Sequence, residues 1–197
     1  NALGAQFAGE VRLSTPVASV QRSGDGVTVV DTKGHADRFD RVLIASHADQ
    51  ALSMIDNPTD AERELLGAFG YTKNTAVLHA DPAFMPRRRR VWSCWNYMAV
   101  DHAESAHPLC VSYWMNRLQS LEGRDLFVTL NPPRDPQHEV ARFEYAHPLF
   151  DTKAIAAQEN LWRIQGQDRI WFAGAHFGRG FHEDGLQSGL AAAEAMG

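Results

Sequence analysis

The sequence predicts an α+β protein, and three observations carry that prediction. Short strands separated by glycine-containing turns end in an apolar stretch at residues 42–45, which is typical of a strand buried on both faces. The middle of the chain alternates aromatic, strand-like runs with Pro, Gly, Asp and Asn, which indicates an antiparallel sheet. The chain then finishes as a strand, a glycine, a loop and a helix.

The first part of the chain is predicted to be a meander that leads into a buried, parallel strand. Gly24-Asp25-Gly26 is a turn signal between two of its strands. Thr59 or Asp60 can cap the second of the two helices that follow, because either side chain accepts a hydrogen bond from a free backbone N–H. The expected elements are strands at residues 11–13, 17–20, 27–30 and 39–45 and helices at residues 47–55 and 59–69.

The middle of the chain is predicted to form an antiparallel sheet, and the end is predicted to alternate helices with one strand. A sheet of about five antiparallel strands is expected in the middle, which is a common size for sheets. Its strands are expected at residues 75–79, 91–97, 109–115, 127–130 and 140–145. After it we expect a helix at residues 151–163, a strand at 169–174, a loop at 175–180 and a helix at 183–196.

Composition excludes some classes of protein. The formal net charge is −5, whereas a nucleic-acid-binding domain normally carries a basic face. No stretch approaches the roughly 20 apolar residues of a membrane span, and the start shows no signal-peptide pattern. Cys94 and Cys110 match neither a disulfide framework nor a zinc motif, so we expect reduced thiols in a cytoplasmic protein. The basic run Arg87–Arg90 fits either a solvated loop or an anion or partner site.

The final strand, loop and helix form the segment with the clearest chemical meaning. The strand ends at Gly174, where the backbone can approach a ligand closely. The following helix begins with unsatisfied N–H groups, which favour anionic or electron-rich partners. Such an arrangement suits a flavin, although a plain strand–helix turn that binds nothing has the same pattern.

This segment resembles the C-terminal signature of the flavin-containing amine oxidase and protoporphyrinogen-oxidase-like family of FAD-dependent oxidoreductases. The residues that carry the resemblance are Phe172-Ala173-Gly174, Gly180-Phe181, Glu183 and Ser188-Gly189. Residues 17–45 resemble the meander that leads into the last strands of that family's FAD domain. The resemblance implies a fragment of an α/β FAD-binding fold at residues 1–55 and 165–197, with an antiparallel substrate domain at residues 56–164.

The resemblance also implies a set of FAD-contacting positions. In the family, the backbone at the position of Val17 contacts the adenine, and Ala45 lies at a strand edge near the cofactor. His182 is expected at the start of the last helix, beside the isoalloxazine ring. The implied cofactor-binding residues are Val17, Ala45, Gly174, Ala175, Gly180, Phe181, His182 and Glu183.

Two departures from the family pattern weaken the expected site. Position 175 is Ala, where the family commonly has an acidic residue that hydrogen-bonds the cofactor. The chain also lacks the Gly-x-Gly-x-x-Gly motif that places pyrophosphate on a helix, since Gly24-Asp25-Gly26 lies in a hairpin turn. We therefore expect weak or absent FAD binding by these 197 residues, with the N-terminal FAD-binding half supplied from elsewhere.

Substrate-side residues are expected where polar groups stand next to aromatic ones. The candidates for substrate contact are Tyr71, Asn74, Trp95 and Asn96, and those for a catalytic role are Lys73 and Tyr97. Lys73 invites comparison with the family's lysine that holds a water near flavin N5, but no spacing supports that match. Ordinary sheet packing is the alternative for each of them. The substrate is expected to be small or lipid-like, oxidised by hydride transfer to the flavin.

Two other functions remain open at this point. The aromatic strands would also suit a non-catalytic, β-rich binding or assembly module that docks a partner. A metal hydrolase could be built on His176, His182, Glu183 and Asp184. These residues lack the i, i+4 spacing of a zinc helix, so no metal site is expected.

Overall fold

The computed structural model describes residues 9–99 and 109–197, and the chain divides into two compact units. The first unit comprises residues 1–70 and 148–197, and the second comprises residues 71–147. The boundaries thus differ from those expected, because the helices at Asp60–Leu66 and Thr152–Gln158 pack with the first unit. The assignment of one unit to FAD and the other to substrate stays a prediction.

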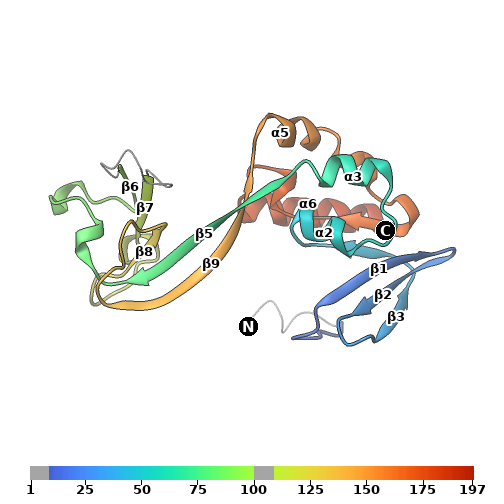
Figure 1. The fold of residues 1–197 in the computed structure, drawn as a ribbon, viewed down its shortest axis with the longest axis horizontal. Coiled ribbons are helices and arrows are strands. Elements are labelled where there is room, and N and C mark those ends of the chain that lie inside the picture. The colour runs from blue at the N-terminus through green and yellow to red at the C-terminus, as the bar shows by residue number, and fades with distance from the viewer. Residues whose placement is uncertain (1–8, 100–108) are drawn as a thin grey trace. The chain divides into compact units, whose positions relative to one another are not determined.

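The first unit begins with a three-stranded antiparallel meander, in which β1 (Val17–Ser23), β2 (Gly26–Asp31) and β3 (Ala36–Phe39) lie side by side (Figure 1). The expected strand at residues 11–13 is wrong, since Ser14 has a positive φ and the chain turns there.

The meander leads into β4 (Val42–Ile44), which pairs in parallel with β10 (Ile170–Phe172). Although 128 residues apart in sequence, Ile44 and Phe172 at the carboxyl end of β10 therefore lie on neighbouring strands. Ile44, Ile170 and Phe172 are all buried. Burial of this strand pair on both faces accounts for its continuous apolar sequence.

Two helices of the first unit are capped by side chains. The Thr59 hydroxyl accepts from the Glu62 backbone N–H at 3.2 Å, and the Glu62 carboxylate accepts from the Thr59 N–H at 2.8 Å. The Glu62 carboxylate is fully buried and paired with Arg22 at 2.5 Å. Asp151 caps the next helix by accepting from the Ala154 N–H at 2.8 Å. The α-helices are α2 (Ala48–Met54), α3 (Asp60–Leu66), α5 (Thr152–Gln158) and α6 (His182–Met196).

The second unit is a five-stranded antiparallel sheet with the strand order β6-β7-β8-β5-β9. Its elements are β5 (Gly70–His79), β6 (Trp95–Ala99), β7 (Leu109–Trp114), α4 (Met115–Leu118), β8 (Phe127–Leu130) and β9 (Glu139–Leu149). Turns of 3₁₀ helix lie at Pro82–Phe84 and Arg89–Val91 here and at Leu161–Ile164, Gln167–Arg169 and Ala175–Phe177 in the first unit. The strand expected at 91–97 begins at Trp95, because the preceding residues form one of these turns.

The two faces of this sheet differ in chemistry. One face packs Phe127 against Trp92 and Met85 and buries a row of polar side chains, Asn96, Ser112 and Thr129. Register places Trp95 opposite Tyr113, Tyr113 opposite Val128, and Val128 opposite Leu78. Directly paired residues share a face, so these four side chains lie together on the other face. Trp95 is 47% exposed, which leaves this second face accessible.

Candidate functional site

The carboxyl ends of β4 and β10 bring two predicted cofactor residues together. Phe172 pairs with Ile44, and the Ala173 N–H donates to the Ile44 carbonyl at 3.0 Å. Since parallel strands end at the same edge, Ala45 and Gly174 follow them side by side. In open α/β sheets ligands bind at this edge.

Gly174 is held by a buried serine of the last helix. The Gly174 N–H donates to the Ser188 hydroxyl oxygen at 3.0 Å. That hydroxyl oxygen lies 3.2 Å from the Gly174 carbonyl and 3.0 Å from the Gly185 carbonyl. Having one proton, the hydroxyl can donate to only one of them at a time. Ser188 thus fixes α6 against the end of β10, a role that the sequence pattern alone did not reveal.

The Asp184 side chain holds the loop between β10 and α6 through two hydrogen bonds. Its carboxylate accepts from the Arg179 N–H at 3.0 Å and from the Phe181 N–H at 2.8 Å. A side chain at Gly178 would overlap this carboxylate, and Gly180 has φ +91° with the Phe150 ring 2.9 Å from where a Cβ would lie. Both glycines are therefore required by the loop's own packing.

Gly174 has a similar explanation. A Cβ there would lie 2.7 Å from the His176 ring and 3.1 Å from the Ser46 carbonyl oxygen. The missing side chain makes room for protein atoms, so the glycine alone does not indicate a ligand. The expected approach of a ligand to the Gly174 backbone stays a prediction.

The start of α6 carries three of the predicted residues on its surface. Phe181, His182 and Glu183 are all exposed, and the helix begins at His182. Glu183 and Asp184 already place two carboxylates in the first turn, where the helix dipole favours negative charge. They weaken the attraction of this helix start for a further anion.

His176 stands out within that loop. Its side chain is 3% exposed, and the ring packs edge-on against Phe69, with 5.4 Å between centroids. Within the described part of the chain, its Nε2 atom has no hydrogen-bond partner. Burial, together with nearby His47, lowers the pKa of His176 to about 4, against an opposing effect of Asp49. The imidazole is therefore neutral at physiological pH.

The sequence offered His176 only as part of a metal cluster, and the geometry does not support such a cluster. His176 is buried, whereas His182 is exposed at the surface of α6. The Asp184 carboxylate is engaged in holding the loop. No group of three or more His, Cys, Asp or Glu side chains suited to a metal ion occurs among residues 9–99 and 109–197.

Val17 lies on the meander rather than at the β4/β10 edge. It opens β1 opposite Asp31, beside a hollow of about 280 Å³ that is also lined by Val29 and Phe39. Charged side chains, including Asp37, line the same hollow. The expected adenine contact at Val17 stays a prediction.

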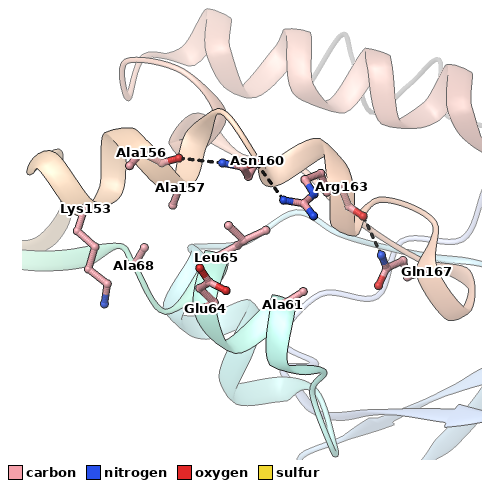
Figure 2. Close-up of a pocket in the computed structure, with 10 residues that line it drawn as sticks. All are labelled: Ala61, Glu64, Leu65, Ala68, Lys153, Ala156, Ala157, Asn160, Arg163 and Gln167. Atoms are coloured by element: carbon pink, nitrogen blue, oxygen red, sulfur yellow. Dashed lines mark hydrogen bonds between the residues drawn. The ribbon is translucent and has the colours of Figure 1, made fainter.

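A groove of about 410 Å³ separates α3 from the segment that begins with α5 (Figure 2). Its lining residues are Ala61, Glu64, Leu65, Ala68, Lys153, Ala156, Ala157, Asn160, Arg163 and Gln167. One wall is held by its own hydrogen bonds, since Asn160 donates to the Ala156 carbonyl, Arg163 to Asn160, and Gln167 to the Arg163 carbonyl. None of the predicted site residues lines this groove.

In the second unit, Asn74 belongs to a polar cluster on β5. Its amide lies 3.0 Å from His147 Nδ1, and its carbonyl oxygen accepts from the Asn131 amide at 2.7 Å. Tyr71 is partly buried at the start of the same strand, and Lys73 is exposed. Strand alternation places Lys73 on the opposite face from Asn74.

Trp95, Asn96 and Tyr97 alternate between the faces of the sheet. Trp95 and Tyr97 are exposed on the accessible face. Asn96 is buried on the other, where its amide donates to the Ser93 and Ser112 carbonyls at 2.8 and 3.2 Å. Its oxygen also accepts from the Ser93 N–H at 3.0 Å. This arrangement favours sheet packing as the role of Asn96.

The accessible face contains an apolar hollow of about 250 Å³. It is lined by Ala76, Leu78, Met115, Gln119, Leu121, Leu126, Val128, Phe143 and Tyr145. The Phe143 and Tyr145 rings stack with centroids 5.9 Å apart, and Tyr145 contacts His147 edge-on. The hollow and the polar cluster around Asn74 are thus neighbours along β9.

Comparison with known proteins agrees with the class that this fold and site indicate. Residues 1–90 match the family model of the flavin containing amine oxidoreductases. The resemblance of the chain to flavin amine oxidase-like oxidoreductases is thereby confirmed. No curated protein matches the sequence.

Solved structures that share the fold include the following two. A protoporphyrinogen oxidase-like protein from Exiguobacterium sp. 255-15 matches with a TM-score of 0.69 and 11% identity, covering 98% of this chain and 49% of that one. A CLA-producing fatty acid isomerase from P. acnes matches with a TM-score of 0.64 and 11% identity, covering 98% and 50%. This chain therefore spans about half the length of each. The α+β prediction, with antiparallel sheets matching a fragment of an FAD oxidoreductase fold, is confirmed.

Membrane crossing can be assessed for the helices of the described residues. None of them is both long and apolar enough to span a bilayer.

Both cysteines are free, and burial raises the pKa of the Cys110 thiol.

Proposed function

We propose that this chain supplies one part of an FAD-dependent oxidoreductase of amine-oxidase type, with its first unit contributing to the flavin site. The observation that carries the proposal is the shared carboxyl edge of β4 and β10, followed by the Ser188-fixed loop into α6. The family match at residues 1–90, which contain β4, supports it. In this proposal the Gly-x-Gly-x-x-Gly motif comes from sequence outside these 197 residues.

The residues present fit a flavin in one specific respect. His176 is a buried polar group whose Nε2 lacks a partner among the described residues, and it lies in the loop that follows Gly174. The backbone of that loop is held in place by Asp184 and Ser188. When bound, the flavin would accept a hydride from the substrate. The protein's part is to position the cofactor and to exclude water from its polar groups.

The second unit is proposed to bind the substrate on the accessible face of its sheet. Its apolar hollow, with Phe143 and Tyr145 stacked beside it, suits a small or lipid-like molecule. The Asn74–His147 pair offers hydrogen bonds to a polar group of that molecule. The fatty acid isomerase of similar fold is named for a lipid substrate, which supports this class. Tyr97, exposed on the same face, is the candidate for a catalytic role there. Lys73, the other candidate from the sequence, lies on the opposite face of β5.

The visible spectrum of the full-length gene product tests this function. We expect the purified protein to show flavin absorbance bands, which bleach when a substrate is added without oxygen. A protein that stays colourless, even after FAD is added and the excess removed, would contradict the proposal. A cytoplasmic location is a separate prediction, which cell fractionation checks.

The isolated 197 residues are expected to bind FAD weakly or not at all. These residues lack the Gly-x-Gly-x-x-Gly motif that normally holds the pyrophosphate, so few contacts remain for a large ligand. Calorimetric titration of this chain with FAD checks the expectation. Submicromolar affinity would contradict it.

A β-rich binding or assembly module is the second candidate function. The observation that favours it is the exposure of Trp95, Tyr97, Phe143 and Tyr145 on the second unit. A full-length product that carries no flavin but co-purifies with a stoichiometric protein partner would support this alternative. In that case substitution of Trp95 and Tyr97 by Ser would release the partner.

A further inference from the structure

His176 Nε2 is an anomaly among the buried polar atoms of the described residues. Only one other buried side-chain atom there lacks a hydrogen bond, Arg22 Nε. That atom lies 3.2 Å from an Asp168 carboxylate oxygen, so its charge is balanced. His176 Nε2 has no such compensation within the described part of the chain. Buried polar groups are normally satisfied, and an exception calls for a specific explanation.

The surroundings of His176 are aromatic, so its unpaired Nε2 atom destabilises the folded chain when no ligand is bound. Its ring contacts Phe69 and Phe177, with centroids 5.4 and 4.9 Å away. A phenyl ring would make the same aromatic contacts without a polar atom to satisfy. The charged or titratable groups that act on His176 are His47 and Asp49, which follow β4. The imidazole itself is neutral, so a neutral hydrogen bond is what its Nε2 requires.

Position in the fold indicates where the missing partner comes from. His176 follows Gly174 by two residues, and its Cε1 and Nδ1 atoms lie 2.7 Å from where a Cβ on Gly174 would be. The carbonyl of His176 accepts from the Gln158 amide at 2.9 Å, which fixes the backbone. The side chain is therefore held at the carboxyl edge of the β4/β10 pair, the edge proposed above for the flavin.

We infer that the partner of His176 Nε2 is the bound flavin cofactor, so that His176 is a cofactor-binding residue. This inference rests on the proposed function and adds to it a residue that the family signature does not include. It also explains why the chain keeps a histidine where an aromatic hydrocarbon would fold at least as well. Functional sites commonly retain groups that the fold alone would not select.

The test compares FAD affinities of the full-length gene product, stripped of cofactor and titrated with FAD by flavin fluorescence. His176→Phe keeps the ring and removes Nε2, and His176→Gln places an amide near the position of Nε2. His79→Phe is the matched control, because His79 is an equally buried histidine in the second unit with both ring nitrogens hydrogen-bonded. Thermal unfolding of each cofactor-free variant checks its folding.

We expect His176→Phe to weaken FAD binding about tenfold, as for the loss of one buried hydrogen bond. We expect His176→Gln to recover much of that loss, His79→Phe to leave FAD affinity unchanged, and cofactor-free His176→Phe to melt no lower than the wild type.

The inference is overturned if His176→Phe binds FAD as tightly as the wild type, which is the result if a buried water is the partner. It is also overturned if His176→Gln loses as much affinity as His176→Phe, or if His176→Phe fails to fold. These outcomes leave the proposed function standing, whereas a wild-type protein that binds no FAD overturns both.

Discussion

The two buried histidines, His79 in the five-stranded sheet and His176 beside the β4/β10 edge, differ in how their nitrogens are satisfied. His79 Nδ1 accepts from the Asp81 N–H at 3.1 Å, and its Nε2 lies 2.8 Å from the Thr129 hydroxyl. Because Nδ1 is an acceptor, Nε2 carries the proton and donates to Thr129. His176 Nε2 has no partner among the described residues. The second unit thus satisfies both nitrogens of its buried histidine internally, whereas the first leaves His176 Nε2 without a partner among the described residues.

The largest expected effect concerns the pH dependence of stability that His176 contributes; burial lowers the pKa of His79 as well. In the folded chain burial lowers the pKa of His176 from 6.5 to about 4. As the pH falls below 6.5, His176 becomes protonated in the unfolded chain but stays neutral in the folded one. The free energy of unfolding therefore decreases until about pH 4, where the folded chain is protonated as well. The loss amounts to about 3 kcal/mol in total. Urea unfolding of the 197-residue chain across this range should show a shallower pH dependence for His176→Phe. Identical slopes for wild type and variant would contradict the burial of a neutral imidazole.

The second prediction compares two glycines with positive φ, one from each unit. Gly180 and Gly123 have similar positive φ values, +91° and +96°, but a Cβ at Gly180 would lie 2.9 Å from the Phe150 ring, whereas Gly123 has open space. Gly123→Ala should lower the free energy of unfolding by about 1 kcal/mol, from backbone strain alone. Gly180→Ala should lower it by about 2 to 3 kcal/mol, since overpacking is added. Urea titrations of both variants measure the difference. Equal losses would show that the loop before α6 is looser than described.

Removing the satisfied histidine should be more damaging than removing the unsatisfied one. His79→Phe leaves the buried Asp81 N–H without its acceptor and takes a donor from Thr129. We expect a loss of about 2 kcal/mol in unfolding free energy, as for partners left unsatisfied after a deletion. His176→Phe, by comparison, should not lower the free energy of unfolding. If both variants lose the same amount in chemical denaturation, the distinction between the two sites fails.

The smallest expected effect concerns two buried serines, one from each region. Ser188→Ala removes the acceptor of the Gly174 N–H, and the unfolding free energy should fall by about 1 to 2 kcal/mol. Ser112→Ala removes a hydroxyl that shares a bond with Thr129, which keeps its bond to His79, so about 1 kcal/mol is expected. Denaturation curves recorded in parallel provide the comparison. A smaller loss at Ser188 than at Ser112 would argue against its role in fixing α6.

Much of the fold was predictable because its signals are local. Gly24-Asp25-Gly26 marks a hairpin, and Thr59 with Glu62 forms a capping box. The apolar run at residues 42–45 indicated a parallel strand, which pairs with β10. The boundaries of the two units were harder to predict from the sequence, because the packing of α3 with α5 depends on contacts between residues about 90 apart in sequence.

The candidate site was predictable in position but not in chemistry. Gly174 and the loop to α6 lie at the expected edge, but the sequence did not reveal that the His176 ring and the Ser46 carbonyl leave no space for a Cβ at Gly174. Strand alternation alone could have placed Asn96 on the opposite face from Trp95 and Tyr97. The unsatisfied Nε2 of His176 could not be found this way, because satisfaction of a buried atom depends on every neighbour in three dimensions.

Melting curves of the cofactor-free full-length product, with and without FAD, test most directly whether His176 is reserved for the flavin. Bound FAD stabilises in proportion to the logarithm of its affinity, so a tenfold weaker variant gains about 1.4 kcal/mol less at saturating ligand. We predict that His176→Phe melts no lower than the wild type without FAD and gains less when FAD is added. Equal gains in the two proteins, or a variant already destabilised without FAD, would contradict the account.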